Sequence, residues 1–126
     1  MEADKSSTVI MVIEDDRLIR SSLQELLEGE GYQVKAAVHG EEALEILDGL
    51  AKPPSLILLD LMMPVMDGQE FLKVLEERVA GGYPALPVII TSAGVDAGRT
   101  SKTLVKEFLK KPIDLDAFLA AIQKYT

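Results

Sequence analysis

Short apolar runs alternate along this chain with segments whose apolar residues recur every three or four positions. The apolar runs predict five strands: Thr8–Ile13, Tyr32–Val38, Ser55–Asp60, Leu86–Thr91 and Phe108–Lys110. Most of these runs are apolar without interruption, as in strands that are buried on both faces of a sheet. The run Tyr32–Val38 is the weakest of the five because polar residues interrupt it.

A helix is expected after each strand. The predicted helices are the segment from Asp16 to Gly29, Glu41–Leu50, the segment bearing Phe71, Leu72, Leu75 and Val79, Val95–Glu107, and the segment bearing Leu115, Phe118, Leu119 and Ile122. Asp16 is placed to cap the first of them, and Gly29 and Gly31 to end it. Five strand–helix units predict an α/β fold, a doubly wound (βα)5 sandwich with one parallel sheet covered on both faces.

The length of 126 residues fits one domain, expected over residues 8–126 behind a flexible tail at residues 1–7. There is no cysteine, which excludes a disulfide framework or a cysteine metal site. The formal net charge of −8 argues against direct binding to nucleic acid. No apolar stretch approaches the roughly 20 residues that cross a bilayer. We therefore expect a cytoplasmic protein with no membrane insertion.

Charged residues gather where the predicted strands end. Glu14, Asp15 and Asp16 follow the first strand, Asp60 ends the third, and Lys111 follows the fifth. The carboxyl ends of parallel strands share one edge of the sheet, where open α/β folds bind ligands. Carboxylates brought together repel one another, so this arrangement needs a cation. An all-oxygen ligand set suggests Mg2+.

Four motifs in this order resemble the receiver domain of two-component response regulators, over Thr8 to Tyr125. The motifs are Val12-Ile13-Glu14-Asp15-Asp16, Leu58-Leu59-Asp60 with the loop through Met63-Pro64 to Asp67-Gly68, Ile89-Ile90-Thr91-Ser92-Ala93, and Lys110-Lys111-Pro112. The resemblance implies a five-stranded parallel sheet of order 2-1-3-4-5, the flavodoxin-like arrangement. It also implies a signalling switch that catalyses its own phosphorylation and dephosphorylation and is not otherwise an enzyme.

The resemblance assigns roles at the metal site. It makes Asp60 the phosphoacceptor, which would form an acyl phosphate. It makes Glu14 and Asp15, with Asp60 and the backbone carbonyl of Met62, the ligands of Mg2+ or Mn2+. Simpler interpretations stay open, namely that Asp60 caps the following turn and that Glu14 and Asp15 form a solvated acidic turn. Asp16 is expected to cap the helix rather than bind metal.

The resemblance also assigns the residues that respond to phosphorylation. Lys111 would pair with Asp60 and then with a phosphoryl oxygen, and the Lys111–Pro112 bond is cis in much of the family. Thr91 would be the switch hydroxyl and Phe108 the switch aromatic. The alternatives are an ordinary strand residue at Thr91 and a static core residue at Phe108. His39, the only histidine, is expected to be a surface loop residue.

The implied partners are a sensor histidine kinase or a histidine phosphotransfer protein, which donates the phosphoryl group, and an unidentified downstream protein. A phosphorylation-dependent dimer is a further option. Three other classes are alternatives: a phosphatase with an aspartate nucleophile, a pseudo-receiver that only binds proteins, and a flavin or dinucleotide module. The phosphatase would need an acid where Met62 stands, and no GxGxxG motif follows the first strand.

The resemblance weakens between Ala93 and Phe108. Gly94 and Gly98 lie near the start of the expected helix and raise the entropy cost of forming it. The hypothesis that follows is a short or locally unstable helix that phosphorylation or a partner orders.

Overall fold

A computed structural model of the chain describes residues 5–93 and 103–126. Its centre is a parallel five-stranded sheet of order β2-β1-β3-β4-β5. This order confirms the expected doubly wound α/β fold. The strands are β1 Val9–Ile13, β2 Gln33–Ala37, β3 Leu56–Asp60, β4 Val88–Ser92 and β5 Val105–Lys110.

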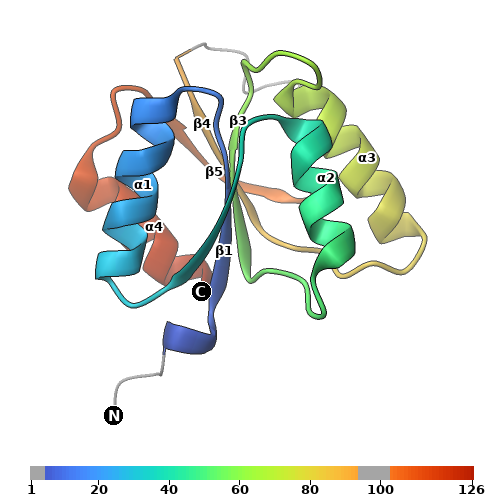
Figure 1. Ribbon diagram of the computed structural model, residues 1–126, viewed down its shortest axis with the longest axis horizontal. Coiled ribbons are helices and arrows are strands. Elements are labelled where there is room, and N and C mark those ends of the chain that lie inside the picture. Colours follow the sequence, from blue (N-terminus) through green and yellow to red (C-terminus); the bar gives the residue numbers. More distant parts are fainter. Residues whose placement is uncertain (1–4, 94–102) are drawn as a thin grey trace.

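Helices cover both faces of the sheet in a three-layer arrangement (Figure 1). Helices α1 and α4 lie on one face, and α2 and α3 lie on the other. The helices are α1 Arg17–Gly29, α2 Gly40–Gly49, α3 Gly68–Ala80 and α4 Leu115–Tyr125. Within the described residues, no helix is both long and apolar enough to span a bilayer.

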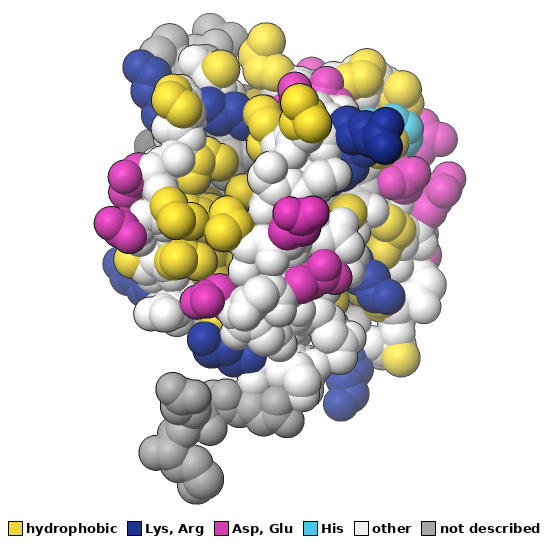
Figure 2. All heavy atoms as spheres, turned by 60° about the vertical axis from the view of Figure 1, so that its left-hand side comes forward, with side chains coloured by type: hydrophobic (Ala, Val, Ile, Leu, Met, Phe, Trp, Pro, Cys, Tyr) yellow, Lys and Arg dark blue, Asp and Glu magenta, His cyan; other side chains and the backbone are white. Residues whose placement is uncertain are grey.

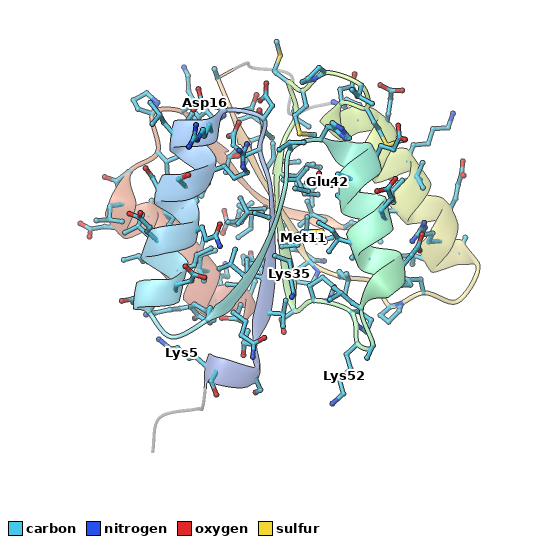
Figure 3. All side chains as sticks on the ribbon, in the orientation of Figure 1. Lys5, Met11, Asp16, Lys35, Glu42 and Lys52 are labelled. Atoms are coloured by element: carbon cyan, nitrogen blue, oxygen red, sulfur yellow. The ribbon has the colours of Figure 1, made fainter. Side chains whose placement is uncertain are left out.

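Alternate residues of each central strand pack into different halves of the core. Ile10 and Val12 of β1 are fully buried and pack with the residues under α1 and α4. Met11, which points toward the α2 side in Figure 3, packs with Ile13 into the other half. Burial on both faces explains why the strand segments read as continuous apolar runs.

Helix caps fix where three helices begin. The Asp16 carboxylate accepts a hydrogen bond of 3.0 Å from the backbone N–H of Ile19, which confirms its expected capping role. Asp67 and Glu70 form a reciprocal capping box at α3. His39 lies in the loop before α2, as expected, but sequence reasoning missed that it caps this helix: it is half-buried and its Nδ1 accepts a 3.1 Å hydrogen bond from the Glu42 N–H. Histidine is not among the preferred N-cap residues, so residue type alone does not predict this cap.

Part of the segment that was expected to be a flexible tail lies against the first strands. Lys5–Ser7 form a single 3-10 turn, η1, and the side chain of Gln33 donates a hydrogen bond to the Ser6 carbonyl. The Lys5 ammonium lies 5.3 Å from the centre of the Tyr32 ring, a cation–π contact. Residues 1–4 lie outside the described part of the chain.

The last strand begins earlier than the sequence predicts. Val105–Lys110 form β5, so the assignment of residues 105–107 to a helix was wrong. Leu104 is buried in the core, and Val105 pairs with Val88 before a register shift that sets Ile89 beside Glu107. Pairing with β4 and burial of these apolar side chains outweigh a weak helical pattern. Thr103 and Leu104 form a turn, so their assignment to the helix was also wrong. Residues 95–102 of the expected helix, and with them the hypothesis of its instability, lie outside the described residues.

Gly68 lets the loop after β3 pack closely against the first turn of α3. A Cβ atom at this position would lie 2.6 Å from Leu61 Cα and 2.7 Å from the Asp60 carbonyl oxygen. Both neighbours are backbone atoms that follow the strand end, so they cannot move aside as a flexible side chain would. Glycine at residue 68 is therefore a packing requirement that places Asp60 and its loop.

Substitution Gly68→Ala should destabilise the fold by about 2 kcal/mol, the cost typical of overpacking a tight site. Urea unfolding of the variant beside the wild type measures this difference. Gly49→Ala is the matched control, because a Cβ there meets nothing within 4 Å. The control should change stability by no more than about 1 kcal/mol. Equal effects at both positions would contradict the packing requirement.

Candidate functional site

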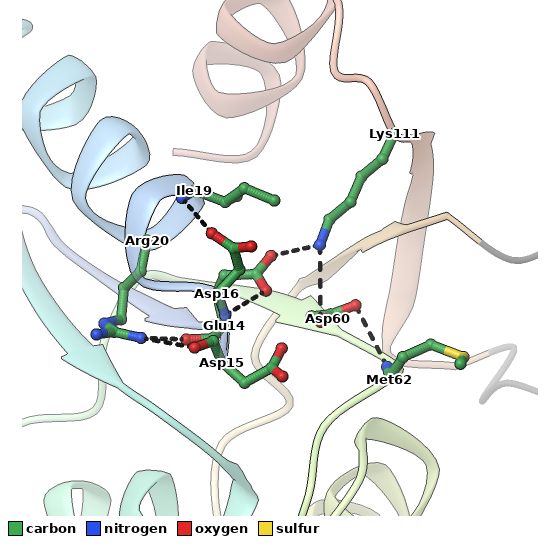
Figure 4. A network of polar contacts seen from close by, with 8 residues as sticks. All are labelled: Glu14, Asp15, Asp16, Ile19, Arg20, Asp60, Met62 and Lys111. Carbon is green, nitrogen blue, oxygen red and sulfur yellow. Dashed lines mark hydrogen bonds and ion pairs between the residues drawn. The ribbon is translucent and has the colours of Figure 1, made fainter.

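Three acidic side chains converge at the carboxyl edge of the sheet. Asp60 is the last residue of β3, and Glu14 follows β1, the neighbouring strand. One oxygen each from Glu14, Asp15 and Asp60 lies within 4.8 Å of the other two. Glu14 and Asp60 are buried, at 1% and 3% exposure, whereas Asp15 is exposed. The convergence expected from the strand ends is thus present (Figure 4).

Lys111 reaches into this cluster from the end of β5. Its Nζ lies 2.6 Å from Glu14 Oε1 and 3.6 Å from Asp60 Oδ2. The expected pair with Asp60 is therefore present, but the closer partner is Glu14, which sequence reasoning did not predict. The backbone N–H of Lys111 donates to the Ser92 carbonyl, and the Lys111–Pro112 bond is cis. Lys110, the neighbouring residue, is exposed.

The environment of the Asp60 carboxyl shifts its protonation equilibrium. Burial is the largest cause and the negative charge of Glu14 the next, and together they raise the pKa of Asp60 to about 7. Lys111 and the hydrogen bond from the Met62 backbone N–H act in the opposite direction. Desolvation wins because one ammonium at 3.6 Å does not replace the lost hydration of the carboxylate.

A cleft opens above these groups. The residues around it are Glu14, Asp15, Asp16, Ile19, Asp60, Met62, Ala93 and Lys111. The backbone N–H of Met62 donates a 3.3 Å hydrogen bond to Asp60 Oδ1, and the Met62 side chain is 69% exposed. The cleft is therefore polar at its base and partly apolar at its rim.

The two proposed switch residues lie on different strands. Thr91 is the register partner of Asp60 on β4 and is 1% exposed. Phe108 of β5 pairs with Ile90, is half-buried, and packs against the core under α2 and α3. Thr91 is therefore on the strand adjacent to the candidate phosphoacceptor, whereas Phe108 is on the next strand. Their switching roles stay predictions.

Sequence reasoning missed an arginine that contacts the acidic turn. Arg20 Nη1 donates to the backbone carbonyls of Glu14 at 2.9 Å and Asp15 at 3.2 Å. Figure 4 shows this guanidinium behind the turn, away from the Lys111 side. The only signal in the sequence is a basic residue one turn into the helix that follows an acidic cluster, which is commonly a surface charge.

The donor set fits a small divalent cation. All three side chains offer carboxylate oxygens, the hard ligands that Mg2+ prefers, and oxygens around an octahedral Mg2+ lie roughly 3 to 4 Å apart. The candidate oxygens lie within 4.8 Å of one another, so only small side-chain movements would bring them to that spacing. Asp15 is exposed, which leaves room for the waters that Mg2+ retains.

Comparison with known proteins defines the class to which this fold and site belong. Residues 10–123 match the response regulator receiver domain family. The chain therefore belongs to this family, the receiver domains of two-component response regulators.

Two curated relatives illustrate the likeness. The DNA-binding transcriptional regulator NtrC of Escherichia coli is 34% identical over 92% of this chain and 24% of its own length. Response regulator MprA of Mycobacterium tuberculosis is 33% identical over 93% of this chain and 50% of its own. The chain thus spans about a quarter to a half of the length of these relatives. The activities of the whole relatives are therefore not assigned to this chain.

Solved structures agree in fold. A response regulator receiver protein from Pseudomonas putida superposes with a TM-score of 0.83 at 28% identity, over 93% of this chain and 96% of its own. The receiver domain of the hybrid histidine kinase CckA gives 0.75 at 32% identity, over 93% and 97%. In each comparison the similarity covers nearly the whole of this chain and nearly the whole of the solved structure.

The raised pKa of Asp60 predicts a pH dependence of stability without divalent cations. The pKa of this acid is about 7 in the folded state, and its ordinary value of 3.8 stands for the unfolded state. Between pH 3.8 and about 7 the folded state therefore binds more protons than the unfolded state. Its stabilising contribution is complete below the lower value and is lost as pH rises through about 7. The free energy of unfolding of the wild type minus that of Asp60→Asn should fall as the pH rises through this window. Denaturant titrations with EDTA measure the difference, and a flat difference would contradict the shift.

Proposed function

We propose that this chain is a phosphorylation switch whose acceptor is Asp60. The observation that carries the proposal is the position of Asp60, which is buried at the sheet edge beside two further acids and within 3.6 Å of Lys111. A carboxylate oxygen of Asp60 would attack the phosphorus of a phosphohistidine. The P–N bond would break, the imidazole would leave with a proton, and an acyl phosphate would remain on Asp60.

Glu14, Asp15, Asp60 and the carbonyl of Met62 are the residues that would hold Mg2+. When bound, the cation supplies positive charge that offsets the repulsion between the carboxylates and the incoming phosphoryl group. It would also lower the pKa of Asp60, because a nearby positive charge favours the ionised carboxylate. The chain's own contribution is to gather these oxygens at the strand ends before the cation binds.

Lys111 and Thr91 are the groups proposed to respond. Lys111 contacts Glu14 at 2.6 Å and Asp60 at 3.6 Å, and a phosphoryl oxygen on Asp60 would offer it a further anionic partner. The Thr91 hydroxyl, on the adjacent strand, would donate to another phosphoryl oxygen. These new contacts would favour one of two arrangements of β4 and β5, including the position of Phe108, and so shift the population.

The phosphodonor is proposed to be a histidine kinase or a phosphotransfer protein. A groove of about 480 Å³ lies between α1 and α4 and includes Lys111 in its wall. Figure 2 shows hydrophobic side chains gathered on this face, and Leu18 at its rim is 79% exposed. An apolar surface beside the acceptor would supply contact area for a protein donor, which a small phosphodonor does not need.

The output of the switch is proposed to be a contact with another protein. Its proposed location is the cytoplasm, where ATP is available to phosphorylate the donor proteins. A phosphorylation-dependent dimer would be one such contact. Direct binding of DNA by this domain is not part of the proposal, because the net charge of −8 opposes association with a polyanion.

Incubation with acetyl phosphate and Mg2+ should add one phosphoryl group, a gain of about 80 Da by intact mass spectrometry. Asp60→Asn should gain nothing, because an amide oxygen is a poor nucleophile. EDTA should abolish the gain in the wild type. Phosphorylation of the Asp60→Asn variant to the same extent would place the acceptor elsewhere, and no gain in either protein would favour a domain that acts through protein contacts alone.

Dephosphorylation should be slow, lasting minutes or more, because Met62 and Ala93 beside Asp60 cannot orient or deprotonate an attacking water. Met62→Asn, which puts a hydrogen-bonding side chain at the exposed rim, should shorten the lifetime several-fold. Met62→Leu is the matched apolar control and should leave it unchanged. The lifetime is measured in the wild type and both variants as the loss of the added mass after acetyl phosphate is removed. A wild-type lifetime of seconds would contradict the expectation.

A further inference from the structure

The acidic turn Glu14–Asp16 has a second cation besides Lys111. Arg20, in the first turns of α1, donates from one nitrogen to the carbonyl oxygens of Glu14 and Asp15, at 2.9 and 3.2 Å. These carbonyls belong to two of the proposed metal ligands. The start of α1 is itself fixed by the cap from Asp16 to Ile19, so Arg20 extends from an anchored helix (Figure 4).

The two cations act on the acids in different ways. Lys111 contacts carboxylate oxygens directly, at 2.6 Å from Glu14 and 3.6 Å from Asp60, so it and a metal ion would be attracted to the same carboxylates. Arg20 contacts only backbone carbonyls among the described residues. Its charge therefore offsets the repulsion between the acids while leaving their carboxylate oxygens available.

Asp15 depends most on this support. The Glu14 carboxylate is buried and bonded both to Lys111 and to the backbone N–H of Asp16. The Asp15 carboxylate is exposed and has no hydrogen bond or ion pair within the described part of the chain. Its direction is therefore set by the backbone of the turn, and the only side chain bonded to the Asp15 carbonyl in that part of the chain is Arg20.

We propose that Arg20 is a positioning residue for the metal site, which holds the backbone of Glu14 and Asp15 so that their carboxylates face Asp60. The inference rests on the proposed function, because it needs Mg2+ to bind there. Residues that orient metal ligands through hydrogen bonds commonly affect metal affinity by ten- to a hundredfold. Arg20 touches neither the metal ion nor the reacting atoms, so its loss should weaken binding without preventing the chemistry.

The test is a titration of the full chain with MgCl2, followed through backbone amide shifts by NMR. Arg20→Gln should raise the Mg2+ dissociation constant about tenfold. Arg20→Lys retains a cationic donor and should recover part of the loss. Arg17→Gln is the matched control, because Arg17 is an exposed arginine on the same helix with no side-chain hydrogen bond or ion pair to any described residue.

Phosphorylation by acetyl phosphate separates positioning from general damage. At saturating Mg2+, Arg20→Gln should reach the wild-type extent of phosphorylation, whereas at limiting Mg2+ it should fall behind. A merely structural role would lower the urea midpoint and the phosphorylation extent at every Mg2+ concentration, and that result would overturn the inference.

Two other results would also overturn it: unchanged Mg2+ affinity in Arg20→Gln, or an equal loss in Arg17→Gln. In both cases the wild type still binds Mg2+, so the proposed function stands and only the role of Arg20 fails. Absence of Mg2+ binding in the wild type would overturn the metal-dependent function together with the inference.

Discussion

Repulsion between carboxylates at one edge of the sheet is the constraint around which this molecule is organised. Glu14 and Asp60 are almost completely buried, and Asp15 lies within 4.8 Å of both. Such a cluster is tolerated only if cations offset it or a proton neutralises it. The structure shows both effects, with Lys111 against the carboxylates, Arg20 behind the turn, and burial that raises the pKa of Asp60 to about 7. A site arranged in this way gains from a divalent cation before any phosphoryl group arrives.

The rest of the fold maintains that arrangement. Parallel register sets Asp60 beside Thr91, and the order of the sheet brings β1 next to β3, so that Glu14 faces Asp60. The packed cores under the two helix layers make the strands rigid, and Gly68 allows α3 to begin against the strand end. Rigidity in the sheet and exposure in the loops are what a switch needs, because only a few groups then respond to a new charge.

Sequence reasoning succeeded where one local pattern determines the outcome. Continuous apolar runs predicted the sheet, and the charged residues at their ends predicted the convergence of Glu14, Asp60 and Lys111. The order of the strands came from the family resemblance. Sequence reasoning failed where partners come from distant segments or from backbone atoms. The cap at His39 and the bonds of Arg20 to two carbonyls are local but involve backbone atoms that residue spacing does not specify, whereas the early start of β5 depends on pairing with β4. Lys111 was expected on Asp60, and its shorter contact with Glu14 could not be predicted because it depends on the relative positions of the ends of β1, β3 and β5.

That contact has a consequence for how the site would be activated. The 2.6 Å bond between Lys111 and Glu14 places an ammonium against a carboxylate that would also bind the metal ion, so in the proposed function metal binding would weaken this ion pair. A cation at Glu14 would weaken the hold on Lys111 and leave it free to approach Asp60 as the phosphoryl group arrives. Arg20 takes no part in this exchange, since it contacts carbonyls rather than carboxylates. In the proposed function the two basic residues would therefore divide the task, with Lys111 moving between anions and Arg20 keeping the ligand backbone in place.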